Sequence, residues 1–217
     1  MPTQCSAEQL TFSWVEGRRV VAAFDGGTIS SDAGALLLGK TDAAIGLVER
    51  LSRCFIDGRN PALVEHSVRT LVGQRVFGLA LGYEDVNDHD RLRHDPVLGA
   101  LLGKLWARRQ SRCAALADKS TLNRLERPPL RGTSRYHKLR SDSNAIERLF
   151  VEVFLEAHRE APAEVVLDLD ATDAVLHGHQ EGRFFHGYYD CYCYLPLYVF
   201  CGEHLLLAKL RPANIDG

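Results

Sequence analysis

The stretch Val165-Val166-Leu167-Asp168-Leu169-Asp170-Ala171-Thr172-Asp173 decides the fold expected of this 217-residue chain. Its apolar first half is typical of a β-strand that is buried on at least one side. Side chains alternate across a strand, so Asp168 and Asp170 should project from the same face, roughly 7 Å apart. Two like charges at that spacing are costly unless a cation or hydrogen bonds meet them, and a divalent metal ion is the simplest relief.

Carboxylate oxygens are the ligands that suit Mg²⁺ or Mn²⁺. In a two-metal arrangement these ions activate water or a hydroxyl group against a phosphodiester. We therefore interpret Asp168 and Asp170 as candidate metal ligands. The residues alone leave an alternative open, in which Asp168 pairs with a lysine or arginine and Asp173 caps a turn.

Two further strands are expected after the carboxylate strand. Residues 188–202 are rich in aromatic side chains and predict one long strand, with a kink allowed near Pro196. Residues 203–210 follow as its antiparallel partner, with Gly202 at the turn. A carboxylate strand followed by two hairpin-linked strands is the opening of a ribonuclease-H-like sheet.

The chain before residue 160 is predicted to be mainly helical, after a short strand at residues 19–24. Helices are expected from about residue 33, over residues 61–81 with Gln74 at the edge of the apolar face, within residues 84–95, from residue 96, and from about 143 to 159. The predicted fold class is therefore α/β. A mostly helical region, residues 1–160, precedes the first three strands of a truncated ribonuclease-H-like domain, residues 161–217.

The charge is distributed unevenly along the chain, although its net value is only −2. Residues 104–140 carry eleven lysines or arginines against two acidic residues, whereas residues 161–217 carry three against eight. This asymmetry is expected if one part neutralises phosphates and another holds metal cations, although a solvated helical surface would also produce it. The candidate DNA-binding residues are Arg108, Arg109, Arg112, Lys119, Thr121, Asn123, Arg124, Arg131, Arg135, Lys138 and Arg140.

Within this segment, residues 116–127 predict a short helix, a turn and a second helix capped by Ser120 or Thr121. Such a unit can place a helix N-terminus against DNA, and an ordinary helical hairpin is the alternative. Residues 127–140 hold prolines and a glycine among basic side chains, and predict an extended arm that follows phosphates.

Zinc, disulfide and membrane roles are not favoured. The six cysteines never occur as C-x-x-C, which predicts reduced thiols, and His177, His179 and His186 are interpreted as loop residues. The acidic residues 84–95 lack the spacing of a calcium loop and predict a short helix instead. No stretch approaches 18 apolar residues and residues 1–14 lack a signal-peptide layout, so a cytoplasmic protein without a membrane partner is expected.

Several short motifs, taken in order, resemble those of bacterial insertion-sequence transposases with a DDE domain. Those that resemble the first catalytic block are Asp168–Thr172, His177–Gly182, Gly187–Asp190, Leu195–Leu197 and Leu210–Asn214. Those that resemble the N-terminal region of the same group are Phe24–Gly27, Gln74–Arg75, Gly82–Asp88 and Ser120–Glu126. The resemblance spans nearly the whole chain, and its specificity comes from the order and spacing of the motifs.

The resemblance implies a catalytic role for Asp170, because the family's first catalytic acid stands two residues before the threonine of the first core strand. Asp168 is the second choice. The family's later aspartate and glutamate have no matching positions before Gly217, which implies an N-terminal portion that is inactive alone. The implied cofactor of the complete enzyme is Mg²⁺ or Mn²⁺.

The implied partner is double-stranded DNA at the terminal inverted repeats of a transposon, in the nucleoid of a bacterial cytoplasm, and the resemblance admits a homodimer. Two other classes of function remain open. One is a non-catalytic DNA-binding module or remnant. The other is a self-contained metal-dependent nuclease, which would take its remaining ligands from Asp173, Glu181 or Asp190.

Overall fold

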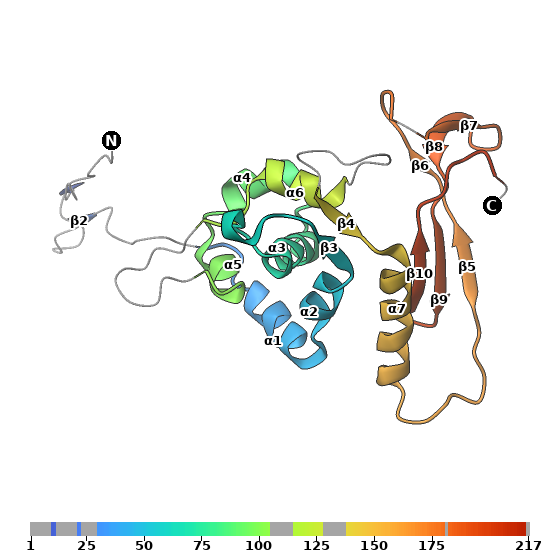
Figure 1. Cartoon of the computed structure of the whole chain (residues 1–217), viewed down its shortest axis with the longest axis horizontal. Helices are drawn as coiled ribbons and strands as arrows, with labels where there is room; N and C mark the ends of the chain where they lie inside the picture. Colours follow the sequence, from blue (N-terminus) through green and yellow to red (C-terminus); the bar gives the residue numbers. More distant parts are fainter. Residues whose placement is uncertain are drawn as a thin grey trace, which may run out of the picture. The chain divides into compact units, whose positions relative to one another are not determined.

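The computed structural model describes residues 10–11, 21–22, 30–104, 115–127, 138–180 and 182–215. The chain mixes helices and strands, as the predicted α/β class requires, and separates into two compact units, Met1–Arg140 and Ser141–Gly217 (Figure 1). The division lies twenty residues before the expected boundary at residue 160, because the helix before that boundary belongs to the unit that holds the sheet. In the parts of the chain given above, no helix is both long and apolar enough to cross a membrane.

The first unit is mainly helical. Its helices are α1 (Ala35–Ile45), α2 (Leu47–Ser52), α3 (Val68–Ala80), α4 (His89–Leu92), α5 (Pro96–Leu101) and α6 (Lys119–Glu126), with 3₁₀ turns η1 (Pro61–Leu63) and η2 (Val86–Asp88). Two pairs of short strands accompany them: β1 (Leu10–Thr11) pairs antiparallel with β2 (Val21–Ala22), and β3 (Phe55–Asp57) pairs with β4 (Leu139–Ser141). The expected strand at residues 19–24 is confirmed only for β2, since its other residues lie outside the described chain.

Helix α3 lies in the middle of this unit and contributes to two buried apolar clusters (Figure 1). Phe77 packs in the first, which also holds Ala35, Val48, Leu92, Leu98, Leu102 and Leu116. Leu71 and Val72 pack in the second, which also holds Ala117, Leu122, Leu125 and Leu139. The second cluster therefore joins α3 to α6 and β4.

Two helix predictions in this unit are wrong in detail. The helix expected over residues 61–81 begins only at Val68, because the Ser67 hydroxyl accepts the Thr70 amide at 3.1 Å and caps it there. The helical hairpin expected over residues 116–127 is a single helix, α6, because Asp118 caps it and residues 115–118 are not helical. The short helices expected within residues 84–95 and from residue 96 are confirmed, the latter capped by Asp95.

The second unit combines one helix with two antiparallel sheets. Helix α7 (Ser143–Ala157) confirms the helix expected from about residue 143; it is capped by Asp142 and packs beside β10 (His204–Lys209). One sheet has the order β10-β9-β5, with β9 at Leu197–Cys201 and β5 at Asp168–Ala171. The other has the order β6-β8-β7, with β6 at Ala174–Val175, β8 at Cys191–Tyr194 and β7 at Phe184–His186.

The strand expected over residues 188–202 is interrupted at Pro196. Its halves β8 and β9 pair in different sheets, so the predicted kink is confirmed and the single continuous strand is wrong. The Pro196 carbonyl accepts the Thr172 amide at 3.2 Å, which holds the bend against the chain between β5 and β6. The predicted β9–β10 hairpin is confirmed, and Gly202 takes the left-handed φ of 57° that its turn requires.

Burial of the carboxylate strand is the main error of the sequence prediction. Residues 165–167 precede β5 and are exposed, and Leu169 within β5 is 64% exposed. The reason is position, because β5 stands at the end of its sheet and pairs with β9 along one edge, while α7 packs beside β10 at the other end.

Candidate functional site

Two acidic side chains project from one face of β5. Asp168 is paired in register with Phe200 and Asp170 with Tyr198, both on β9. Alternate residues of a strand share a face, so the carboxylates point the same way, as the sequence predicts. Both are exposed, and neither makes a hydrogen bond or ion pair to another described residue. Their oxygens are free to meet a ligand from solvent.

The donor chemistry of this pair fits a hard divalent cation such as Mg²⁺, which takes carboxylate oxygens. The described residues do not gather three acidic, histidine or cysteine side chains at any one place. Asp173 follows β5 in the bend and Asp190 lies in a turn with a φ of 52°, while Glu181 is outside the described residues. Asp168 and Asp170 therefore fit as part of a ligand set.

A second arrangement of polar groups holds α6, the helix that carries several of the predicted DNA-binding residues. Gln74, on α3, is fully buried, although the sequence predicts it at the edge of the apolar face. Its Nε2 donates to the Ala117 carbonyl at 2.9 Å, and its Oε1 accepts the Ala117 amide at 3.0 Å. A side-chain amide thus binds both polar groups of the backbone just before α6, as a neighbouring strand would.

The next residue, Arg75, holds the other end of α6. Its guanidinium pairs with Glu126, the last residue of α6, and donates to the carbonyls of Tyr83 at 3.1 Å and Glu84 at 2.7 Å. The Tyr83 hydroxyl in turn donates to Asp32 at 3.1 Å, and burial followed by this bond raises its pKa. Three of the motif segments noted in the sequence, Gln74–Arg75, Gly82–Asp88 and Ser120–Glu126, thus contribute to one network.

His89 lies inside this network and is fully buried. Its Nδ1 is 3.2 Å from Gln74 Nε2 and its Nε2 is 3.4 Å from Arg75 Nη1, and both neighbours are donors. Burial, followed by the positive charge of Arg75, lowers the pKa of His89 below its ordinary value. The imidazole is therefore held neutral.

The predicted DNA-binding residues of α6 fall into two groups. Lys119 pairs with Asp90 at 3.3 Å, and Thr121 donates to the capping carboxylate of Asp118, whose pKa the side chain and amide of Thr121 lower. Asn123 and Arg124 are exposed and make no hydrogen bond or ion pair to another described residue. The first group stabilises the helix start, and the second faces solvent.

The other predicted DNA-binding residues lie on β4 or outside the described chain. Lys138 and Arg140 flank the buried Leu139 on β4 and are exposed. The residues Arg108, Arg109, Arg112, Arg131 and Arg135 lie outside the described residues.

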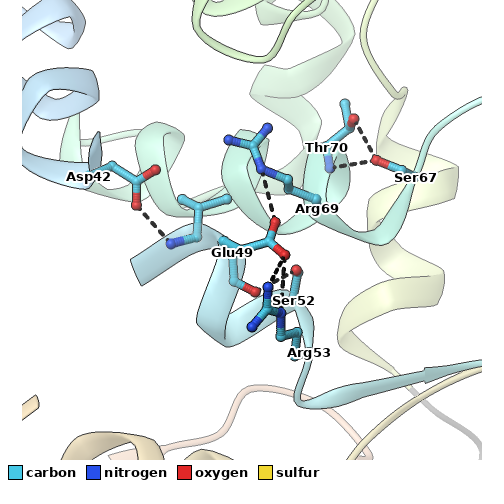
Figure 2. A network of polar contacts seen from close by, with 8 residues as sticks. Asp42, Glu49, Ser52, Arg53, Ser67, Arg69 and Thr70 are labelled. Carbon is cyan, nitrogen blue, oxygen red and sulfur yellow. Dashed lines mark hydrogen bonds and ion pairs between the residues drawn. The ribbon is translucent and has the colours of Figure 1, made fainter. Parts of the chain in front are cut away.

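A further polar network links α2 to α3 at the surface of the first unit (Figure 2). Glu49 pairs with Arg53 at 2.9 Å and with Arg69 at 3.3 Å, and the Asp42 carboxylate accepts the Val48 amide at 2.7 Å. All these groups satisfy one another, so Figure 2 shows a structural connection.

Sequence reasoning missed the roles of Gln74 and His89. Periodicity assigns a polar residue beside an apolar stripe to the helix edge, because it cannot foresee a buried backbone segment that needs a partner. The available signal was the pair Gln74–Arg75 in an otherwise apolar helix, two long polar side chains with several donors each.

Comparison with known proteins adds the family. No curated protein and no solved structure matches the chain. A family model described as transposase DDE domain group 1 matches residues 12–217, which includes α6, the Gln74–Arg75 network and the carboxylate strand β5. The chain belongs to the transposase DDE domain group 1 family.

Proposed function

We propose that this chain acts in DNA transposition, with Asp170 as the first metal-binding carboxylate of the active site and the basic part of the first unit as a DNA-binding region. The DNA is a duplex with the terminal inverted repeats of an insertion sequence, which places the protein at the nucleoid of a bacterial cell. Membership of the family supports the first statement, and the uneven charge supports the second.

The observation that carries the proposal is the position of Asp170 on β5. The strand order β10-β9-β5, antiparallel throughout, agrees with the first three strands of a ribonuclease-H-like sheet. Asp170 stands near the end of β5, exposed, on the same face as Asp168. A carboxylate held on a strand keeps a fixed direction, which metal-dependent phosphodiester chemistry demands of its ligands.

When bound, Mg²⁺ or Mn²⁺ would supply an activated nucleophile and neutralise charge on the phosphate. This chain would contribute the oxygens of Asp170, with Asp168 as an adjacent donor. Both carboxylates are exposed, so their oxygens are accessible to such a cation from solvent.

Excision of the element in cells tests the catalytic assignment. The gene would be expressed in its natural element, and repaired donor sites would be counted by quantitative PCR. Asp170→Asn should reduce excision at least a hundredfold, because an amide is a poor Mg²⁺ ligand. Glu164→Gln, an exposed charge change four residues before β5, should leave excision unchanged.

Equal excision by Asp170→Asn and the unaltered protein would overturn the catalytic assignment. A self-contained nuclease makes a different prediction, because Glu181→Ala would then weaken Mn²⁺ binding by the purified chain as strongly as Asp170→Asn. A chain that binds repeat DNA but supports no excision even unaltered would be a non-catalytic DNA-binding module.

Salt dependence tests the DNA-binding region. Replacing the four cations Arg131, Arg135, Lys138 and Arg140 by glutamine should weaken duplex binding and flatten the slope of log affinity against log salt by about 3.6. An unchanged affinity and slope would show that these residues do not contact phosphates. Fluorescence anisotropy with a labelled duplex measures both quantities.

A further inference from the structure

The outer face of α6 is polar at helical spacing. Ser120, Asn123 and Arg124 stand at positions i, i+3 and i+4, so they share one side of the helix, and all three are exposed. Leu122 and Leu125 lie on the opposite side and are buried against α3 and β4. An α-helix with its side chains is about 10–12 Å across, which matches the width of the major groove of B-DNA, about 12 Å.

The acidic residues of α6 are already occupied by partners inside the protein. Asp118 accepts the amide and side chain of Thr121, and Glu126 pairs with Arg75. Lys119 likewise pairs with Asp90. The outer face is therefore left with the hydroxyl of Ser120, the amide of Asn123 and the guanidinium of Arg124, and its charge complements that of DNA.

Two more exposed cations, Lys138 and Arg140, flank a residue of β4 that packs in the same apolar cluster as α6. Leu139 is buried in the cluster that seats Leu122 and Leu125, so its neighbours Lys138 and Arg140 project to the opposite, exposed side of the strand. The Lys138 carbonyl accepts the Gly58 amide at 2.9 Å, which fixes the start of the strand.

Both ends of α6 are fixed, so its outer face has one orientation. The Gln74 amide holds the backbone before the helix and Arg75 holds Glu126 at its end. Readout of base edges needs this kind of rigid presentation, because each hydrogen bond to a base depends on direction.

We propose that α6 is the helix that reads DNA sequence, with Asn123 and Arg124 contacting base edges in the major groove and Lys138 and Arg140 contacting phosphates. This rests on the DNA binding proposed above and assigns its specificity. Asparagine pairs with the donor and acceptor of adenine, and arginine with the two acceptors of guanine. Contacts to phosphate position the protein and carry no sequence information.

The test starts from the full chain and a library of duplexes with 20 random base pairs, from which bound sequences are enriched. Affinities are then compared for the enriched duplex and a scrambled duplex. Asn123→Ala and Arg124→Lys should each lower affinity for the enriched duplex roughly tenfold and leave the scrambled duplex nearly unchanged. Arg124→Lys keeps the charge and loses the planar fork of donors.

Contacts from Lys138 and Arg140 to phosphates predict a loss of affinity that does not depend on the DNA sequence. Lys138→Gln with Arg140→Gln should weaken both duplexes by the same factor and reduce the salt slope by about 2. Lys40→Gln, on the exposed side of α1, is a control that removes one positive charge away from α6 and β4, and it should change affinity for neither duplex. Circular dichroism of each variant confirms that these exposed substitutions leave the fold intact.

Three results would overturn the inference while leaving the proposed DNA binding in place. They are enrichment of no sequence by a chain that binds DNA, equal weakening of both duplexes by Asn123→Ala and Arg124→Lys, and no effect of either substitution. Failure of the unaltered chain to bind any duplex would overturn the DNA-binding proposal itself.

Discussion

The two compact units differ in which side chains they bury: the first buries polar side chains, and the second leaves apolar side chains exposed. In Met1–Arg140, the polar Gln74 and His89 are fully buried, and both oxygen and nitrogen of the Gln74 amide are hydrogen-bonded to the Ala117 backbone. In Ser141–Gly217, apolar side chains at the carboxylate strand are exposed, with Val166 at 67% and Leu169 at 64%. The composition of a segment therefore does not decide its burial, which depends on what the fold brings against it.

This difference has a consequence for function. In the first unit, Gln74 and Arg75 bind the two ends of α6, so only the outer face of that helix remains available to a partner. On β5 the carboxylates of Asp168 and Asp170 are exposed to solvent and remain available to a cation. Rigid presentation comes from packing in the first unit and from strand pairing with β9 in the second.

The largest expected effect on stability comes from comparing a buried leucine of the first unit with an exposed leucine of the second. Leu122→Ala, at a fully buried position, should lower the free energy of unfolding by about 3 kcal/mol, because it removes apolar contacts and leaves a cavity. Leu169→Ala, at the 64% exposed position, should change it by less than about 0.5 kcal/mol. Urea unfolding followed by circular dichroism measures both, and equal losses would mean that β5 is covered in solution.

The buried amide gives the next largest effect. Gln74→Leu keeps the volume but leaves the amide and carbonyl of Ala117 buried without partners, so stability should fall by about 2 kcal/mol. Asn144→Leu, an exposed amide on α7, is the matched control in the second unit and should stay within about 0.5 kcal/mol. If the two substitutions lower the free energy of unfolding equally, the hydrogen bonds from Gln74 to the Ala117 backbone do not stabilise α6.

Local signals in the sequence predicted some ends of elements. The helix starts expected at residue 96 and at about residue 143 are confirmed, and Asp95 and Asp142 accept amides of the first turn there. Gly202 likewise marked the β9–β10 turn, since glycine tolerates the positive φ. These features depend on neighbours in the chain, which a sequence displays directly.

Features that depend on distant residues were not predictable in the same way. The burial of Gln74 depends on the backbone of Ala117, 43 residues away, and the exposure of Leu169 depends on the place of β5 at the end of its sheet. The candidate carboxylates were predictable because strand alternation is local. Which residues complete their ligand set is a tertiary property, as is the outward direction of Asn123 and Arg124.

The neutral His89 predicts a pH dependence. Its pKa is lowered in the folded state, so the unfolded chain binds the extra proton first as pH falls. Stability should be fully present above about pH 6.5, the ordinary value, and decline below it by at most about 1.4 kcal/mol per pH unit for this group. Burial lowers the pKa of His66 in the same direction, so it adds to the decline.

Urea unfolding at pH 7.5, 6.5 and 5.5 measures this slope, and His89→Gln should flatten it. An NMR titration of the His89 ring keeps the prediction testable if that variant is unstable. A ring whose pKa in the folded protein is at or above its ordinary value would contradict the neutral state, which follows from burial and the positive charge of Arg75.

The smallest effect on stability is expected for the ion pair between Arg53 and Glu49 at the surface (Figure 2). Arg53 is 74% exposed and pairs with Glu49, so Arg53→Gln should cost less than about 0.5 kcal/mol, and 0.5 M NaCl should abolish the difference. Arg75 is only 12% exposed and serves three partners, so Arg75→Gln should cost several times more and resist salt, because its loss leaves carbonyls and Glu126 unpaired. Similar costs for both arginines would mean that water reaches the Arg75 network, and that α6 is held by its leucines alone.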